Sequence, residues 1–101
     1  MLKIQLNKPV KNTKGEEIKE LAFDFSAING NMMINAEKSA RTMGDQTLDI
    51  IYSMNYQLIL ASKVAKVSFN VLKDLPGNQI NQIVTNLKLF LLSTEGVKSE
   101  E

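Results

Sequence analysis

The sequence predicts an α+β fold: an N-terminal β-hairpin packed on a bundle of three main α-helices plus a short helical turn. Two observations predict it. In two segments, 2–6 and 21–25, apolar residues recur at every second position, the period of a strand with one buried face. After that point they recur at spacings of three and four, which is typical of amphipathic helices. A two-stranded hairpin is not stable alone in water, so we expect the helices to cover its apolar face.

The hairpin is predicted from two alternating segments and the turn residues between them. Its inward-facing positions are Leu2, Ile4 and Leu6 in the first strand and Leu21, Phe23 and Phe25 in the second. Turn-forming residues lie between them at Asn7, Pro9, Asn12 and the Lys14-Gly15 pair. Ile18 is out of phase with the second strand, which indicates either a bulge near Lys19 and Glu20 or a strand that begins after Ile18.

The first helix is predicted to begin near Asn29 or Asn31, either of which can cap it, and to end at Gly44. Helical spacing places Met32, Ala36, Ala40 and Met43 on its apolar face, with Met33 at the margin. The opposite face carries Glu37, Lys38 and Arg41, and Ile34 falls among these charges.

The second helix is predicted to be capped by Asp45 or Thr47 and to run to about Lys66. One dense apolar arc of this helix contains Ile50, Ile51, Met54, Leu58, Ala61 and Ala65, and a looser arc contains Leu48, Tyr52, Tyr56, Ile59 and Leu60. A helix that is apolar on two sides has two neighbours. It is therefore either the central element of the domain or a core helix with one face left for another subunit.

The C-terminal part is predicted to contain a short helical turn and a final helix. Ser68 can cap the turn, and Leu75-Pro76-Gly77 ends it. The final helix begins near Asn78 and ends at about Ser93, with an apolar stripe of Ile80, Ile83, Val84, Leu87, Phe90 and Leu91. We expect a single domain over residues 1–96, a polar tail over 97–101, and a core that includes Met54, Leu58, Ile83, Leu87 and Phe90.

Composition argues against an enzyme. The chain contains neither cysteine nor histidine, and its net charge is +1. It therefore lacks the commonest general base, the commonest transition-metal ligand and thiolate chemistry, so we expect no catalytic residues, no cofactor and no metal site. The N-terminus has no secretory signal pattern, and the longest apolar segment, 50–67, is interrupted by polar residues. These features predict a cytoplasmic protein that does not contact a membrane.

Six residues are candidate partner contacts: Met33, Ile34, Tyr52, Tyr56, Leu89 and Leu92. Ile34, Leu89 and Leu92 lie outside the apolar stripes, and surplus apolar residues on a polar helix face mark a contact with another molecule. The methionines of the first helix can form an adaptable binding surface or fill the core. The two tyrosines can anchor an interface or pack on the hairpin. The lysines around the hairpin turn, Lys8, Lys11 and Lys14, can contact phosphate or protect an edge strand from unwanted pairing.

Several segments resemble one protein family over nearly the whole chain, from Leu2 to about Leu92. They are KIQLNKPV and IKELAFDF in the hairpin, NAEKSARTMGD in the first helix, LKDLPGNQI before the final helix, and KLFLL near its end. Together they resemble the phage tail assembly chaperones of contractile-tailed and Mu-like phages and prophages.

The resemblance implies a protein of the bacterial host cytoplasm that is absent from the mature virion. It implies that the protein binds the tape measure protein, which such chaperones keep soluble, and that it helps to recruit tail tube subunits. It also implies a homo-oligomer, in which several copies coat the long partner. It brings no catalytic residues. The alternative function is a small nucleic-acid-binding regulator that uses a helix and the hairpin lysines. The near-zero net charge and the lack of a basic stripe on any predicted helix argue against nucleic acid as a partner.

Overall fold

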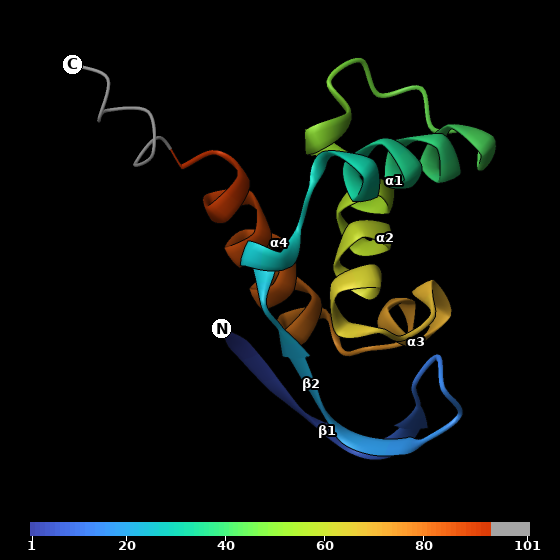
Figure 1. Cartoon of the computed structure of the whole chain (residues 1–101), viewed down its shortest axis with the longest axis vertical. Helices are drawn as coiled ribbons and strands as arrows, with labels where there is room; N and C mark the ends of the chain where they lie inside the picture. Colours follow the sequence, from blue (N-terminus) through green and yellow to red (C-terminus); the bar gives the residue numbers. More distant parts are fainter. Residues whose placement is uncertain (94–101) are drawn as a thin grey trace.

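The computed structural model describes residues 1–93 and has the predicted α+β fold. Two antiparallel strands, β1 (Leu2–Lys11) and β2 (Glu17–Phe23), precede four α-helices: α1 (Gly30–Thr42), α2 (Met54–Ala65), α3 (Phe69–Lys73) and α4 (Gly77–Leu91). Two single 3-10 turns, η1 (Phe25–Ala27) and η2 (Ile50–Tyr52), precede α1 and α2. In Figure 1, α1 crosses one end of α2, while α3 and the hairpin lie toward its other end. The predicted tail, 97–101, and the predicted domain end at residue 96 lie outside the described residues.

The pairing of the hairpin is interrupted in the middle of β1. Residues pair from Leu2 with Phe23 to Gln5 with Glu20, and pairing resumes only at Val10 with Ile18. Four residues of β1, 6–9, therefore face the single residue Lys19. The irregularity predicted at Lys19 is confirmed, but the extra residues belong to β1. The alternative of a second strand beginning after Ile18 is wrong, because β2 begins at Glu17.

The hydrophobic core is built around α2. Seven consecutive residues of this helix, 56–62, are buried, so both predicted arcs contribute to the interior and α2 is the central element. α2 contacts β2 and all three of the other helices. The buried apolar residues are Ile4, Leu21, Phe23, Phe25, Ala36, Ala40, Tyr56, Leu58, Ile59, Leu60, Ala61, Val67, Leu72, Ile83, Val84 and Leu87. The predicted burial of Leu58, Ile83 and Leu87 is confirmed.

Three residues predicted to be inside lie at the surface. Met54 is 51% exposed because α2 begins at this residue and not near Leu48. Phe90 is 44% exposed: one side of its ring meets Phe25, with ring centroids 6.3 Å apart, at the edge of the core. Met43 follows the last turn of α1 and is also exposed.

The helix ends follow local capping rules at some positions and tertiary contacts at others. Asn29 caps α1 as predicted, its side chain accepting a hydrogen bond from the backbone N–H of Met32 at 3.0 Å. The N-cap of α2 is Ser53, whose Oγ accepts from the N–H of Tyr56 at 3.2 Å, so the predicted caps Asp45 and Thr47 are wrong.

The C-cap of α2 is Lys66, which adopts the left-handed conformation with φ of 61°. Among the described residues it is the one non-glycine with a positive φ. The Lys66 carbonyl accepts a hydrogen bond from the N–H of Thr13 at 2.9 Å. This contact ties the tip of the hairpin to the corner between α2 and α3.

We expect Leu87→Ala to lower the free energy of unfolding by about 2 to 5 kcal/mol, because it opens a cavity at a fully buried position. The control, Met54→Ala, removes a side chain that is half exposed and should cost less than about 1 kcal/mol. Urea denaturation of the two variants measures the difference. Equal losses would contradict the placement of Met54 outside the core.

We expect Lys66→Gly to stabilise the protein by about 0.5 to 1 kcal/mol, because glycine adopts the left-handed conformation without the steric penalty of a Cβ. The matched control is Lys63→Gly, an exposed lysine in the last turn of α2, which should destabilise by about 1 kcal/mol. Thermal denaturation of both variants provides the measurement. A destabilised Lys66→Gly variant would show that the Lys66 side chain stabilises the folded protein by more than its left-handed backbone conformation costs.

Candidate functional site

The polar side chains of the described residues form no metal centre. No group of three or more acidic side chains within residues 1–93 could hold a metal ion. Every buried side-chain nitrogen and oxygen in the same range has a hydrogen-bond partner, so no buried side-chain polar atom indicates a ligand site. The features that remain as candidate sites are exposed apolar side chains and open pockets.

The most prominent apolar exposure lies on the connection between α1 and α2. We use the name connector surface for the exposed apolar side chains of this connection and its two ends, Met43, Leu48, Tyr52 and Met54, which lie within twelve residues of sequence. Met43 also lines a pocket with Ile59 and Phe69. Leu48 is 99% exposed. In Figure 1 this connection runs from the end of α1 back over that helix to the start of α2. A segment with several exposed apolar side chains is typical of a surface that contacts another protein.

The path of this connection is held by backbone hydrogen bonds to one arginine. Arg41 Nη1 donates to the carbonyl of Thr47 at 2.6 Å and to the carbonyl of Asp45 at 3.2 Å. Its Nη2 forms an ion pair with Glu37 on the preceding turn of α1, at 3.3 Å. Arg41 therefore links the outward-facing side of α1 to the loop that bends back over it.

Asp45 is the centre of a second set of hydrogen bonds, which joins the loop to the start of α2. Its carboxylate accepts hydrogen bonds from the hydroxyl of Ser53, from the N–H of Thr47 at 2.9 Å and from the side-chain amide of Asn55 at 3.2 Å. These donors, with Ser53 contributing most, hold the pKa of Asp45 well below its ordinary value. The connector surface is therefore presented on a loop that the protein orders in advance of any contact.

The six residues predicted to contact a partner differ in their exposure. Ile34, Tyr52, Leu89 and Leu92 are exposed, as a partner contact requires. Met33 is half-buried and packs against the core. Tyr56 is only 2% exposed, so its prediction as a partner contact is wrong. Its position in the first turn of α2 directs the ring inward, where burial and the charge of Glu37 raise the pKa of the phenol.

The predicted residues are not brought together into one site. Tyr52 lies on the connector surface, Ile34 lies on α1, and Leu89 and Leu92 lie at the end of α4. The sequence analysis missed Leu48 and Met54 as surface residues because it extended the second helix through residue 48. It missed Met43 because helical spacing placed that residue on the apolar face of the first helix, whereas α1 ends before it. The cluster of capping and turn residues at Gly44, Asp45, Thr47 and Asp49 is a signal that could have indicated a loop there.

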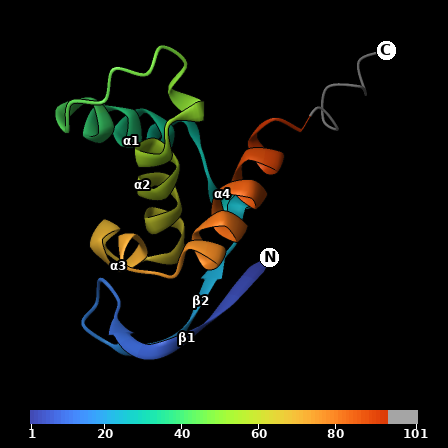
Figure 2. The same ribbon diagram turned by 180° about the vertical axis from the view of Figure 1, so that it is seen from behind.

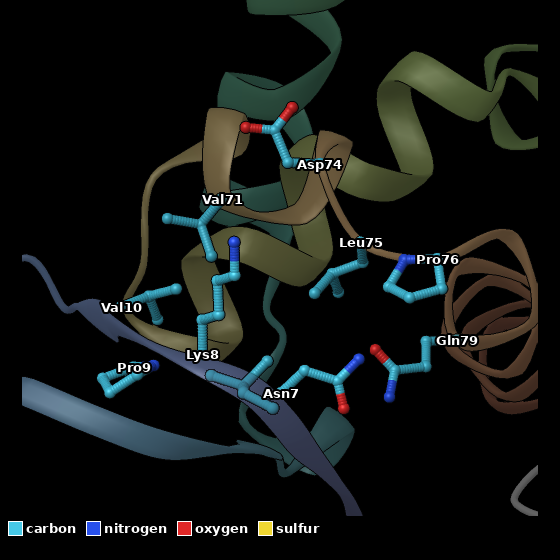
Figure 3. A pocket seen from close by; sticks show the side chains of 10 residues that line it. Asn7, Lys8, Pro9, Val10, Val71, Asp74, Leu75, Pro76 and Gln79 are labelled. Atoms are coloured by element: carbon cyan, nitrogen blue, oxygen red, sulfur yellow. The ribbon is translucent and has the colours of Figure 1, made fainter.

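A pocket of about 420 Å³ lies between β1 and the turn from α3 to α4. It forms where the irregular part of β1 faces α3, and its wall includes Val10, Val71 and Leu75. Figure 3 shows the side chain of Lys8 extending across the pocket toward α3. Asp74 also lines it, so the wall carries a charge of each sign and lacks the concentrated positive charge that phosphate binding favours. Lys11 and Lys14 are exposed and lie outside this wall.

Comparison with protein-family models, with curated proteins and with solved structures finds no match to the chain. Within residues 1–93, none of the helices combines the length and the apolar character needed to cross a membrane.

We expect Asp45→Asn to lower the melting temperature at pH 7, because the amide cannot accept all the hydrogen bonds that the carboxylate accepts. The folded-state pKa lies below the ordinary value of 3.8, so the carboxylate's stabilisation is present at neutral pH and is lost as the pH falls below about 4. The difference in melting temperature between wild type and variant should therefore shrink at acidic pH.

Calorimetric melting temperatures from about pH 7 down to about pH 3 measure this trend. Asp49→Asn is the matched control, since the Asp49 side chain makes no capping hydrogen bond, and it should leave the melting temperature at pH 7 almost unchanged. A difference between wild type and Asp45→Asn that grows on acidification would contradict the assigned role of the carboxylate.

Proposed function

We propose that this protein is a non-catalytic chaperone of phage or prophage tail assembly. It binds the tape measure protein in the host cytoplasm and helps to recruit tail tube subunits. The observation that carries the proposal is the connector surface: four large apolar side chains exposed along the connection between α1 and α2 and at its two ends. The resemblance of the hairpin, α1 and α4 segments to tail assembly chaperones supports the same conclusion.

The physical argument concerns what such a surface can bind. A long, aggregation-prone partner exposes apolar helix faces before it is assembled, and covering them requires apolar area on the chaperone. Because Arg41 and Asp45 already order the loop, binding requires little further loss of conformational entropy. Methionine and tyrosine side chains suit this task, since methionine adapts its shape and tyrosine provides rigid contact area.

We expect the Leu48→Ser/Tyr52→Ser variant to lose most of its ability to keep the tape measure protein soluble on co-expression in bacteria. Buried contact residues at interfaces cost more than about 1 kcal/mol each when truncated, so affinity should fall about tenfold or more. Both residues are exposed, so the fold should be retained, and circular dichroism checks this. The matched control is Leu48→Met/Tyr52→Phe, which keeps the apolar area and should keep the activity.

Undiminished rescue of the tape measure protein by the serine variant would reject the connector surface as the binding site. A salt-dependent affinity of the wild-type chain for duplex DNA, without any effect on the solubility of the tape measure protein, would support the nucleic-acid-binding alternative instead.

A further inference from the structure

The pocket that Met43 lines lies where the end of α1, the C-terminal half of α2 and the start of α3 meet. Its volume is about 490 Å³, within the range of about 300 to 1,000 Å³ that is typical of ligand pockets. In Figures 1 and 2, α1 and α3 lie on the same side of α2, and the turn of the hairpin lies beside α3. Thr13 in that turn also lines the pocket, and its N–H bonds to the carbonyl of Lys66.

The inner wall of this pocket is apolar. Ile59 and Val67 are buried residues that line it, and half-buried Phe69 and half-exposed Met43 add further apolar surface. The hydroxyl of Ser62, another residue of the wall, donates to the carbonyl of Ile59 at 2.7 Å, so its hydrogen is used within α2. A wall of this kind accepts apolar side chains, and the flexible Met43 side chain can adapt to their shape.

The charged groups on this wall are all positive, and we call the pocket the basic pocket. Lys63 and Lys66 are exposed at the end of α2, and no described carboxylate lines the pocket with them. Lys73 adds an ammonium group next to the wall, since its Nζ lies 5.4 Å from the centre of the Phe69 ring. Within residues 1–93 the one ion pair joins Arg41 to Glu37, so these three lysines have no carboxylate partner there.

The acidic side chains closest in sequence to the α1 side of the basic pocket are engaged elsewhere. Glu37 pairs with Arg41, and the carboxylate of Asp45 accepts hydrogen bonds from the connection and from the start of α2. The pocket beside β1 provides the contrast, because its wall carries both Lys8 and Asp74. The basic pocket therefore combines an apolar interior with positive charge that the described part of the chain leaves unpaired.

We propose that the basic pocket binds an acidic segment of a partner protein. An apolar side chain of that segment enters the pocket, and carboxylates on either side of it meet Lys63 and Lys66. Charge complementarity selects this occupant, because a basic segment would be repelled and a neutral one would leave both ammonium groups unpaired. The apolar wall contributes affinity, while the lysines at the edge determine which segment associates.

Two other anionic partners suit the basic pocket less well. A nucleic acid gains its affinity from many phosphate contacts along the backbone, and three lysines around one pocket provide few of them. An anionic bilayer presents its charge as a broad plane, whereas the apolar residues here line a pocket between helices.

This inference does not rest on the proposed function. Met43 is the one residue that the connector surface and the wall of the basic pocket share. The Leu48→Ser/Tyr52→Ser variant, which removes the connector surface, changes no residue of that wall. It should therefore bind an acidic segment as well as wild type does, whatever its effect on the tape measure protein.

The test is the binding of a fluorescein-labelled synthetic peptide to the full-length chain, measured by fluorescence anisotropy. In the acidic peptide, one phenylalanine and two leucines are flanked by glutamates, and in the matched basic peptide every glutamate is replaced by lysine. We expect wild type to bind the acidic peptide and not the basic one. Raising the salt concentration from about 0.05 to about 0.5 M should weaken binding several-fold, because salt screens the ion pairs. An acidic peptide whose three apolar residues are serine should not bind.

Lys63→Glu/Lys66→Glu should raise the dissociation constant of the acidic peptide at least about fivefold and should bind the basic peptide instead, because it reverses the charge of the wall. The matched control is Lys3→Glu/Lys8→Glu, which makes the same change of net charge at exposed lysines outside this wall. It should keep the affinity of wild type. Circular dichroism verifies that both variants are folded.

An acidic peptide that does not bind wild type at protein concentrations up to about 1 mM would overturn the proposal. Equal affinities of wild type and Lys63→Glu/Lys66→Glu for this peptide would overturn it too. Duplex DNA or phosphatidylglycerol vesicles that bind through these two lysines, in a chain that ignores the acidic peptide, would assign the basic pocket to that ligand and reject the protein segment.

Discussion

The structure depends on one constraint: the central part of α2 must be buried. All seven of its residues from 56 to 62 are buried, and the helices α1, α3 and α4, the strand β2 and the two 3-10 turns all contact this helix. α1 crosses one end, α4 lies alongside, and the hairpin and α3 close the other end. Burial of this segment therefore determines which face of each surrounding element points inward.

Both ends of this helix are fixed by polar contacts with segments distant from its core. At the start, Ser53 caps the helix and donates to Asp45, which in turn orders the connection from α1. At the end, the carbonyl of Lys66 receives a hydrogen bond from Thr13 at the tip of the hairpin. These contacts add little apolar burial, but they determine where the central helix begins and stops.

Once α2 is covered, the remaining large apolar side chains have no place in the interior of the monomer. Most of them lie at the connector surface and at the C-terminal end of α4, and Ile34 lies on α1. The connector surface belongs to a connection held by a hydrogen-bond network, whereas Leu89 and Phe90 lie on a helix.

The sequence by itself determined the elements whose signals are local. The alternation of the hairpin, the start of α1 near Asn29 or Asn31, its end near Gly44 and the core positions Leu58, Ile83 and Leu87 all follow from short-range patterns. Only the tertiary structure decided that residues 43–53 form a loop, that Tyr56 turns inward, and that Met54 and Phe90 stay at the surface. The reason is physical: the apolar residues of α2 lie on more than one side of the helix, so periodicity cannot select the face that neighbours cover. That choice, and with it the location of the exposed apolar side chains, is made by contacts between segments far apart in the chain.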